Sequence, residues 1–227
     1  MILLSLMPRR SLDAARTEAL ANRILSPDEI DCWLRLPGDA RRSEWLDGRL
    51  AAKLNLRRFL QDQGLGSRLR EIEVLPRDGV PWVWVAGIPP PHLSISHCSC
   101  LVATAVSPDS AIGVDIEPIR SRHPAVARYF LRAAERDLVQ SFLGGGSAAL
   151  TGLWTLKEAA LKACSLGLQV PPSCVEVGFD QRLRITLHAP LASRWCVRTA
   201  CVRRIGDHVM AVAAAEPAKD SVSSSTS

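Results

Sequence analysis

The segment from Trp154 to Lys162 constrains the fold most, because it consists almost entirely of residues that favour a helix. At about 100° per residue, Trp154, Glu158 and Lys162 fall on one stripe of this helix. A second, apolar stripe must be covered by a core and contains Leu153, Leu156, Ala160 and Ala163. Taken alone, the segment is typical of an amphipathic helix with a Glu-to-Lys pair four residues apart.

Strands are predicted on both sides of this helix. After it, apolar and polar residues alternate at 174–179, 182–189, 195–204 and 208–216, which predicts an antiparallel sheet with one covered face. Before it, strands are predicted at the N-terminus and at 69–75, 80–86 and 101–107, and helices at 11–37, with a break at Ser26 and Pro27, and at 41–60. This mixture of elements indicates an α+β fold.

Two further segments lie just before the central helix. Residues 133–142, which include Glu135, are predicted to form a helix. The glycine-rich segment 144–152 is expected to be a flexible loop. It contains no lysine and follows no strand, so it is not a phosphate-binding P-loop.

Length and composition limit the class of protein. The 227 residues, 47% of them hydrophobic, can bury a full core in one large domain or two smaller lobes. The seven cysteines contain no CxxC pair, which argues against a disulfide framework or a zinc site and favours a reduced, cytoplasmic setting. No apolar run approaches the length of about 18 residues that crosses a bilayer. We therefore expect a soluble protein without a membrane partner.

The charge balance suggests an anionic partner. The net charge is +5, and the pI is about 9.0. Phosphate ligands, acidic proteins and nucleic acid would all fit. Aromatic residues make up only 5% of the chain, so few side chains could stack on the bases of a nucleic acid.

The strand predicted at 111–117 carries two carboxylates on one face. Alternation places Asp115 and Glu117 opposite Val114 and Ile116, with the carboxylates within about 7 Å of each other. Such a pair is costly inside a protein unless a cation balances it, and Mg²⁺ prefers oxygen ligands of this kind. A solvated outer face of the strand is the alternative, and both readings stay open.

Basic residues gather on the helix predicted at 41–60. The spacing of Arg42, Arg49, Lys53 and Arg57 keeps them on one side, either as a solvated face or as an anion site. Ser96 and His97 precede a buried strand and could form a phosphate cup, although a lone histidine is more often structural.

Three motifs in this order, SISHC, GVDIE and WTLKEAALK, resemble the 4′-phosphopantetheinyl transferase superfamily, in its surfactin-synthetase-activating type and W/KEA subgroup. The resemblance covers about residues 40–216 and includes EWLDGRLAAK (44–53) and DGVP (78–81). It implies two similar α/β lobes in a pseudo-dimer, with coenzyme A in a cleft between them. The lobes would be residues 1–108 and 109–216, the second with the metal carboxylates, followed by a disordered tail at 217–227.

The resemblance also implies a role for each matching residue. Asp115, Glu117 and Glu158 would hold Mg²⁺. Catalysis would rest on Glu158 as candidate base, Lys162 at the leaving phosphate, and Glu135 as ligand, base or orienting group. The residues that would bind coenzyme A are Arg49, Lys53, Ser96, His97, Lys157 and Lys162.

The implied activity is the transfer of 4′-phosphopantetheine from coenzyme A to a serine of an apo acyl or peptidyl carrier protein. The products would be the holo carrier and adenosine 3′,5′-bisphosphate. The enzyme would be a cytoplasmic monomer of polyketide, nonribosomal peptide or siderophore biosynthesis, without a nucleic-acid partner. The alternative is a module that binds coenzyme A or nucleic acid without turnover.

Two positions depart from the family pattern. Val80 stands where many relatives have a basic residue, and Arg42 or Arg77 could replace that cation. Arg132 stands where a serine is usual ahead of Glu135, which removes a helix cap worth about 1 kcal/mol. Neither change affects the carboxylates, so activity is still expected.

Overall fold

The computed structural model describes residues 1–166 and 169–218. The chain divides into two compact units, Met1–Asp109 (unit 1) and Ser110–Ser227 (unit 2), each of which is described by itself. Of the predicted tail, residues 219–227 lie outside the described residues, and Pro217 is the last residue of a strand.

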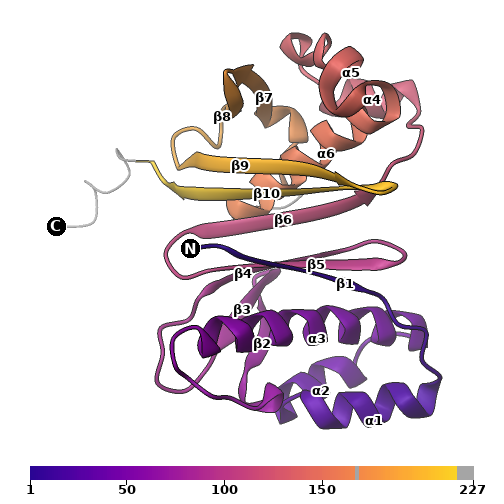
Figure 1. The fold of residues 1–227 in the computed structure, drawn as a ribbon, viewed down its shortest axis with the longest axis vertical. Helices are drawn as coiled ribbons and strands as arrows, with labels where there is room; N and C mark the ends of the chain where they lie inside the picture. The colour runs from indigo at the N-terminus through magenta and orange to yellow at the C-terminus, as the bar shows by residue number, and fades with distance from the viewer. Residues whose placement is uncertain (167–168, 219–227) are drawn as a thin grey trace, which may run out of the picture. The chain divides into compact units, whose positions relative to one another are not determined.

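Unit 1 combines a three-stranded antiparallel sheet of order β1-β5-β4 with a two-stranded hairpin, β2-β3 (Figure 1). The long helix α3 packs on the sheet and buries Ala52, Leu56 and Phe59. The elements in chain order are β1 (Leu3–Pro8), α1 (Ala14–Ile24), α2 (Pro27–Leu34), α3 (Asp39–Gln61), η1 (Leu69–Glu71), β2 (Glu73–Arg77), β3 (Val80–Trp84), β4 (His92–His97) and β5 (Leu101–Ser107).

Local sequence signals explain the boundaries of these helices. Ser26 and Glu29 form a capping box at the start of α2: the Ser26 N–H donates to Glu29 Oε2 at 2.9 Å, and the Glu29 N–H donates to Ser26 Oγ at 3.3 Å. The break predicted at Ser26 and Pro27 is confirmed. Ser96 and His97 belong to strand β4 itself, whereas only the following strand was predicted.

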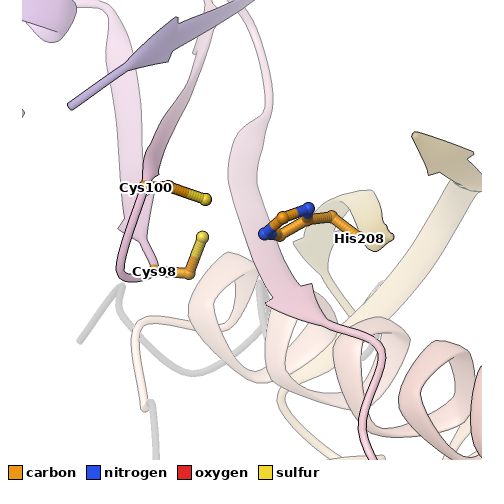
Figure 2. A group of neighbouring side chains, drawn as sticks. All are labelled: Cys98, Cys100 and His208. Carbon is orange, nitrogen blue, oxygen red and sulfur yellow. The ribbon is translucent and has the colours of Figure 1, made fainter. Parts of the chain in front are cut away.

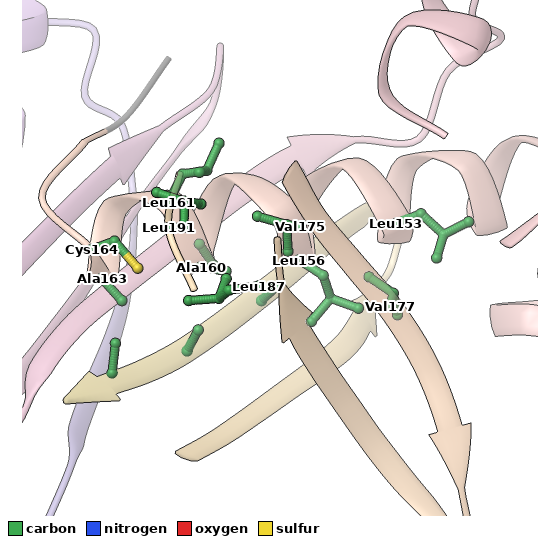
Figure 3. Close-up of a cluster of buried hydrophobic side chains, with 14 of the residues drawn as sticks. Leu153, Leu156, Ala160, Leu161, Ala163, Cys164, Val175, Val177, Leu187 and Leu191 are labelled. Carbon is green, nitrogen blue, oxygen red and sulfur yellow. The ribbon is translucent and has the colours of Figure 1, made fainter. Parts of the chain in front are cut away.

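Unit 2 has the same plan, with a three-stranded antiparallel sheet of order β6-β10-β9 and a hairpin, β7-β8. Helix α6 packs on this sheet and carries the core residues Leu153, Leu156 and Ala160 (Figure 3). The elements are β6 (Ala111–Pro118), α4 (Pro124–Phe130), η2 (Ala133–Glu135), α5 (Leu138–Ser141), η3 (Phe142–Gly144), α6 (Gly146–Ala163), η5 (Pro172–Cys174), β7 (Val175–Asp180), β8 (Arg182–Leu187), β9 (Trp195–Ile205) and β10 (His208–Pro217).

The prediction of a flexible loop at 144–152 is wrong, because α6 begins at Gly146. The positive φ angles of Gly144 and Gly145 turn the chain into the helix. Inside the helix, Gly152 leaves room for η3, since a Cβ there would lie 2.5 Å from a methyl carbon of Leu143. The continuous helix predicted at 133–142 is also wrong: η2 and α5 form two short turns instead.

The two units repeat one order of elements. In each, a first strand (β1 or β6) is followed by short helices, a long helix (α3 or α6), a hairpin and two strands that complete the sheet. The first strand pairs with the last strand, β5 or β10, in both units. This confirms the predicted α+β class with two similar lobes. In the described part of the chain, no helix has the length and apolar character needed to cross a membrane.

Candidate active site

A close approach of strand to helix builds the acidic site of unit 2. A Cβ on Gly113 would lie only 1.9 Å from the backbone oxygen of Ala159, so only glycine allows β6 to lie this near α6. Asp115 follows Gly113 by two residues on the strand, and Glu158 precedes Ala159 on the helix. The glycine therefore brings these two carboxylates into one buried region.

Glu158 is the most perturbed acid of this region. Its side chain is buried, and burial together with the negative charges of Asp115 and Glu117 raises its pKa to about 7, against the opposing effect of Lys162 and Arg122. Within the described residues, the buried Oε1 atom of Glu158 has no hydrogen-bond partner. A buried carboxylate oxygen of this kind calls for a cation or a proton.

Two cations neutralise the neighbouring carboxylates. Lys162 Nζ donates to Asp115 Oδ1 at 2.7 Å and to the Val114 carbonyl at 3.3 Å, so it pairs with the strand rather than with Glu158 on its own helix. Arg122 Nη2 lies 3.5 Å from Glu117 Oε2, and the guanidinium carbon is 5.0 Å from the centre of the Trp154 ring.

The residues fit a hard divalent cation. Asp115, Glu117 and Glu158 offer carboxylate oxygens, which Mg²⁺ prefers, and Glu158 Oε1 is available to a ligand. Among the described residues, these three side chains do not bring one oxygen each within 4.8 Å of the others. A shared metal would therefore require their side chains to move closer together.

A separate pocket in unit 1 contains the predicted basic residues Arg49 and His97. This pocket has a volume of about 310 Å³, and its other lining residues are Arg41, Glu44, Trp45, Gly48, Pro76, Gly79, Val80, Pro81 and Ile95. The guanidinium of Arg49 stacks 4.1 Å from the centre of the Trp45 ring, and burial lowers the pKa of Arg49 to about 10. Its buried Nε has no hydrogen-bond partner in the described residues.

Glu44, which lines this pocket, forms two ion pairs there. It pairs with His97 Nδ1 at 3.2 Å and with Arg41 Nη1 at 2.9 Å. Burial would raise the pKa of Glu44, but the hydrogen bond from Arg41 and the charges of His97 and Arg9 outweigh it, and the pKa is lowered. The sequence predictions missed Glu44 and Arg41, although both lie within residues 40–216, the range of the resemblance described above.

Arg42 and Arg77, the residues suggested to replace the basic side chain that Val80 lacks, do not line this pocket. Arg42 donates to the carbonyls of Leu34 and Leu36, and Arg77 stacks 5.8 Å from the centre of the Trp82 ring. Arg41 lines the same pocket as Val80 and is the additional arginine there. Ser96 is buried on the same strand as His97 but does not line the pocket.

Lys157 lies in the core of unit 2 and not in the acidic cluster. Its Nζ donates to Glu135 Oε2 at 2.8 Å, to the Phe130 carbonyl at 2.8 Å and to the Val175 carbonyl at 2.6 Å. The side chains of Lys157 and Glu135 have no exposed surface. All three donors of Lys157 are used inside the protein in this structure, and its contact with coenzyme A stays a prediction.

Glu135 is fixed in the same arrangement. Its Oε2 also accepts from the Arg132 N–H at 2.7 Å, and its Oε1 accepts from the Val177 N–H at 2.7 Å. These bonds tie η2 to β7 and to α6. The structure therefore gives Glu135 a place in the core rather than beside the acidic cluster.

Lys53 repeats this arrangement in unit 1. Its Nζ donates to Glu29 Oε2, to the Ile24 carbonyl at 2.6 Å and to the Leu69 carbonyl at 3.1 Å, and the pair is fully buried. Glu29 Oε1 accepts from the Val74 N–H at 3.1 Å, as Glu135 accepts from the start of β7. The donors of Lys53 are used in the same way, and its contact with coenzyme A also stays a prediction.

The comparison with protein families agrees with this geometry. Residues 111–213, which contain the acidic cluster, match the family described as the 4′-phosphopantetheinyl transferase superfamily. Over these residues the chain is similar to that superfamily. The predicted resemblance is thereby confirmed at the level of the superfamily.

Curated transferases and synthases resemble the chain over part of their length. Enterobactin synthase component D of Salmonella typhimurium is 33% identical over 142 residues, which is 61% of this chain and 54% of that protein. A 4′-phosphopantetheinyl transferase of Bacillus pumilus is 32% identical over 114 residues, 50% of this chain and 48% of its own. The chain thus spans about half the length of these relatives.

A solved structure is also similar in part. The holo-[acyl-carrier-protein] synthase of Thermotoga maritima is 21% identical, with a TM-score of 0.39. The similarity covers 56% of this chain and 71% of that protein.

Proposed function

We propose that this protein transfers the 4′-phosphopantetheine group of coenzyme A to a serine of an apo acyl or peptidyl carrier protein. The buried acidic cluster carries the proposal: Glu158, with a pKa near 7, lies in the field of Asp115 and Glu117 beside the ammonium of Lys162. The cluster falls inside the segment that matches the superfamily. The W/KEA subgroup, a monomeric state and a cytoplasmic location belong to the same proposal.

In this mechanism Asp115, Glu117 and Glu158 would hold a magnesium ion. The ion supplies, when bound, positive charge that neutralises the pyrophosphate of coenzyme A. Lys162 turns from Asp115 toward the phosphate that leaves and stabilises the charge that builds there. The ion and Lys162 would together stabilise the negative charge of the phosphate groups in the transition state of phosphoryl transfer.

Glu158 is the candidate base for the serine hydroxyl. The pKa of about 7 belongs to the site without a metal. A bound cation favours the carboxylate form of Glu158, which is the form that can accept a proton. The serine oxygen then attacks the β-phosphorus in line with the leaving oxygen, and adenosine 3′,5′-bisphosphate departs. Glu135, which is buried with Lys157, acts on the site only by supporting α6.

The pocket of unit 1 would bind the nucleotide end of coenzyme A. The buried Nε of Arg49 can donate to a phosphate oxygen, and His97 and Arg41 add positive charge. The face of the Trp45 ring is already covered by Arg49. Replacing Arg49 by glutamine should raise the KM for coenzyme A, while Arg58→Gln, an exposed arginine on the same helix, should leave it unchanged.

The proposal is tested by incubating the protein with an apo carrier protein, coenzyme A and Mg²⁺, and by weighing the carrier. We expect a mass gain of one phosphopantetheinyl group that depends on Mg²⁺ and disappears in Glu158→Gln and Asp115→Asn. Asp180→Asn changes an exposed carboxylate of the same unit and should retain full transfer. Binding of coenzyme A without any mass gain on acyl, aryl and peptidyl carriers would instead indicate a binding module.

The names of the curated relatives support a carrier in a synthase of secondary metabolism. The net charge of +5 would attract an acidic carrier surface. We propose a carrier domain of siderophore, polyketide or nonribosomal peptide biosynthesis as the natural substrate. Comparing kcat/KM between such carriers and a fatty-acid carrier tests this preference.

A further inference from the structure

Two cysteines share the short turn between β4 and β5 of unit 1. The turn is closed by the Cys98 N–H, which donates to the Leu101 carbonyl at 2.9 Å. The sulfur atoms of Cys98 and Cys100 lie within 4.8 Å of each other and on the same side of the turn (Figure 2). The two thiols are therefore neighbours without any rearrangement of the chain.

Arg9, the residue after β1, holds the backbone of both cysteines. The Arg9 N–H donates to the Cys100 carbonyl at 2.7 Å, and Arg9 Nη1 donates to the Cys98 carbonyl at 3.5 Å. Residues two positions apart span at most about 7 Å, and less in a turn. A disulfide requires a Cα separation of about 4.4–6.8 Å, and this range lies within that limit.

The two thiols differ in environment. Cys100 is exposed, whereas Cys98 is partly buried. Burial raises the pKa of the Cys98 thiol, and the neighbouring Cys100 raises it further against the backbone hydrogen bonds that lower it. An external reagent therefore meets Cys100 first, and Cys98 is placed to react second.

We propose that Cys98 and Cys100 are a dithiol modification site that is oxidised to an intramolecular disulfide by exchange with a small disulfide molecule. The Cys100 thiolate attacks one sulfur of the reagent, forms a mixed disulfide and releases one thiolate. The Cys98 thiolate then attacks Cys100 Sγ, forms the internal bond and releases the second thiolate. Two protein thiols lose two electrons and two protons, and the reagent is reduced to two thiols.

The remaining described cysteines provide an internal comparison. Cys164 is buried, and burial raises its pKa to about 12, so it is protected from exchange. Cys201 is exposed on β9, like Cys100 on its turn. Cys201 therefore serves as the matched control for a reactive cysteine without the turn of Cys98 and Cys100.

The test treats the reduced protein with oxidised glutathione and then alkylates the thiols that remain. We expect the wild-type protein to protect Cys98 and Cys100 from alkylation without retaining glutathione on either, and reduction should restore both thiols. Cys98→Ser should accumulate a glutathione adduct on Cys100, because the second step is removed. Cys201→Ser should behave as the wild type does.

Three results would overturn the proposal. The wild-type protein could keep glutathione on Cys100, which would show that Cys98 does not close the bond. Cys100 could be found joined to a different cysteine by peptide mapping. Both thiols could also remain open to alkylation after equilibration with a large excess of oxidised over reduced glutathione.

Discussion

Replacing Lys157 by methionine removes the cation that neutralises Glu135, a carboxylate with no exposed surface. The substitution also leaves the carbonyls of Phe130 and Val175 without the donor that Lys157 supplies. Breaking a buried ion pair on one side costs about 3–5 kcal/mol, because the remaining charge has lost its partner. For a chain of this size, we expect a fall in melting temperature of about 2–4 °C for each kcal/mol.

Urea denaturation followed by circular dichroism measures this loss. Changing Glu135 to glutamine removes the stranded charge, so Lys157→Met should cost at least about 1 kcal/mol less in that background. At a temperature where Lys157→Met is folded, its KM for coenzyme A should equal that of the wild type. A loss of stability below about 1 kcal/mol together with a raised KM would refute the structural role and place Lys157 at the coenzyme.

Four further outcomes follow from the acidic cluster and the strand that carries it. Glu158 must lose its proton to bind a metal, so the Kd for Mg²⁺ should rise about tenfold per unit as pH falls below about 7 in calorimetric titrations, and Glu158→Gln should remove this dependence. Without metal, the free energy of unfolding should fall as pH rises from 4.5 to about 7, because the folded state holds the proton that the unfolded state has lost. Arg122→Gln should tighten Mg²⁺ binding several-fold in the same titration, since its charge opposes the ion, and the exposed Arg120→Gln should change it far less; equal effects would contradict this. Gly113→Ala should destabilise the protein by about 1–3 kcal/mol or more in urea, because its Cβ would overlap the Ala159 backbone, and a stability equal to wild type would disprove the close approach.

Local signals in the sequence predicted much of the fold. The capping box at Ser26 and Glu29 fixes the start of α2, and residues 41–60 contain the turns of a long amphipathic helix that the structure extends to Asp39–Gln61. The start of α6 was missed because three glycines usually mark a loop. Here the burial of Ala148 and Ala149 in the core stabilises the helical conformation of the segment after Gly146.

The candidate site was predictable where its chemistry lies within a motif. Asp115 and Glu117 share one strand, and the resemblance joined them to Glu158. The burial of Lys53 and Lys157 was not predictable, because their acceptors come from segments 16–29 residues away in the sequence. A lysine beside a functional glutamate looks like a ligand-binding residue until its carbonyl acceptors are known.

The ion pairs of Lys53 with Glu29 and of Lys157 with Glu135 limit how this chain can vary over generations. Replacing one partner of either pair leaves the other charge unpaired in the core, which is strongly destabilising. Both partners must therefore be replaced together. The residue that follows each lysine is not part of its ion pair, and it differs between the units: Leu54 follows Lys53, whereas Glu158 follows Lys157. Two units built alike can therefore differ completely in reactivity, and one of them can gain or lose a reactive group while both keep the same internal frame.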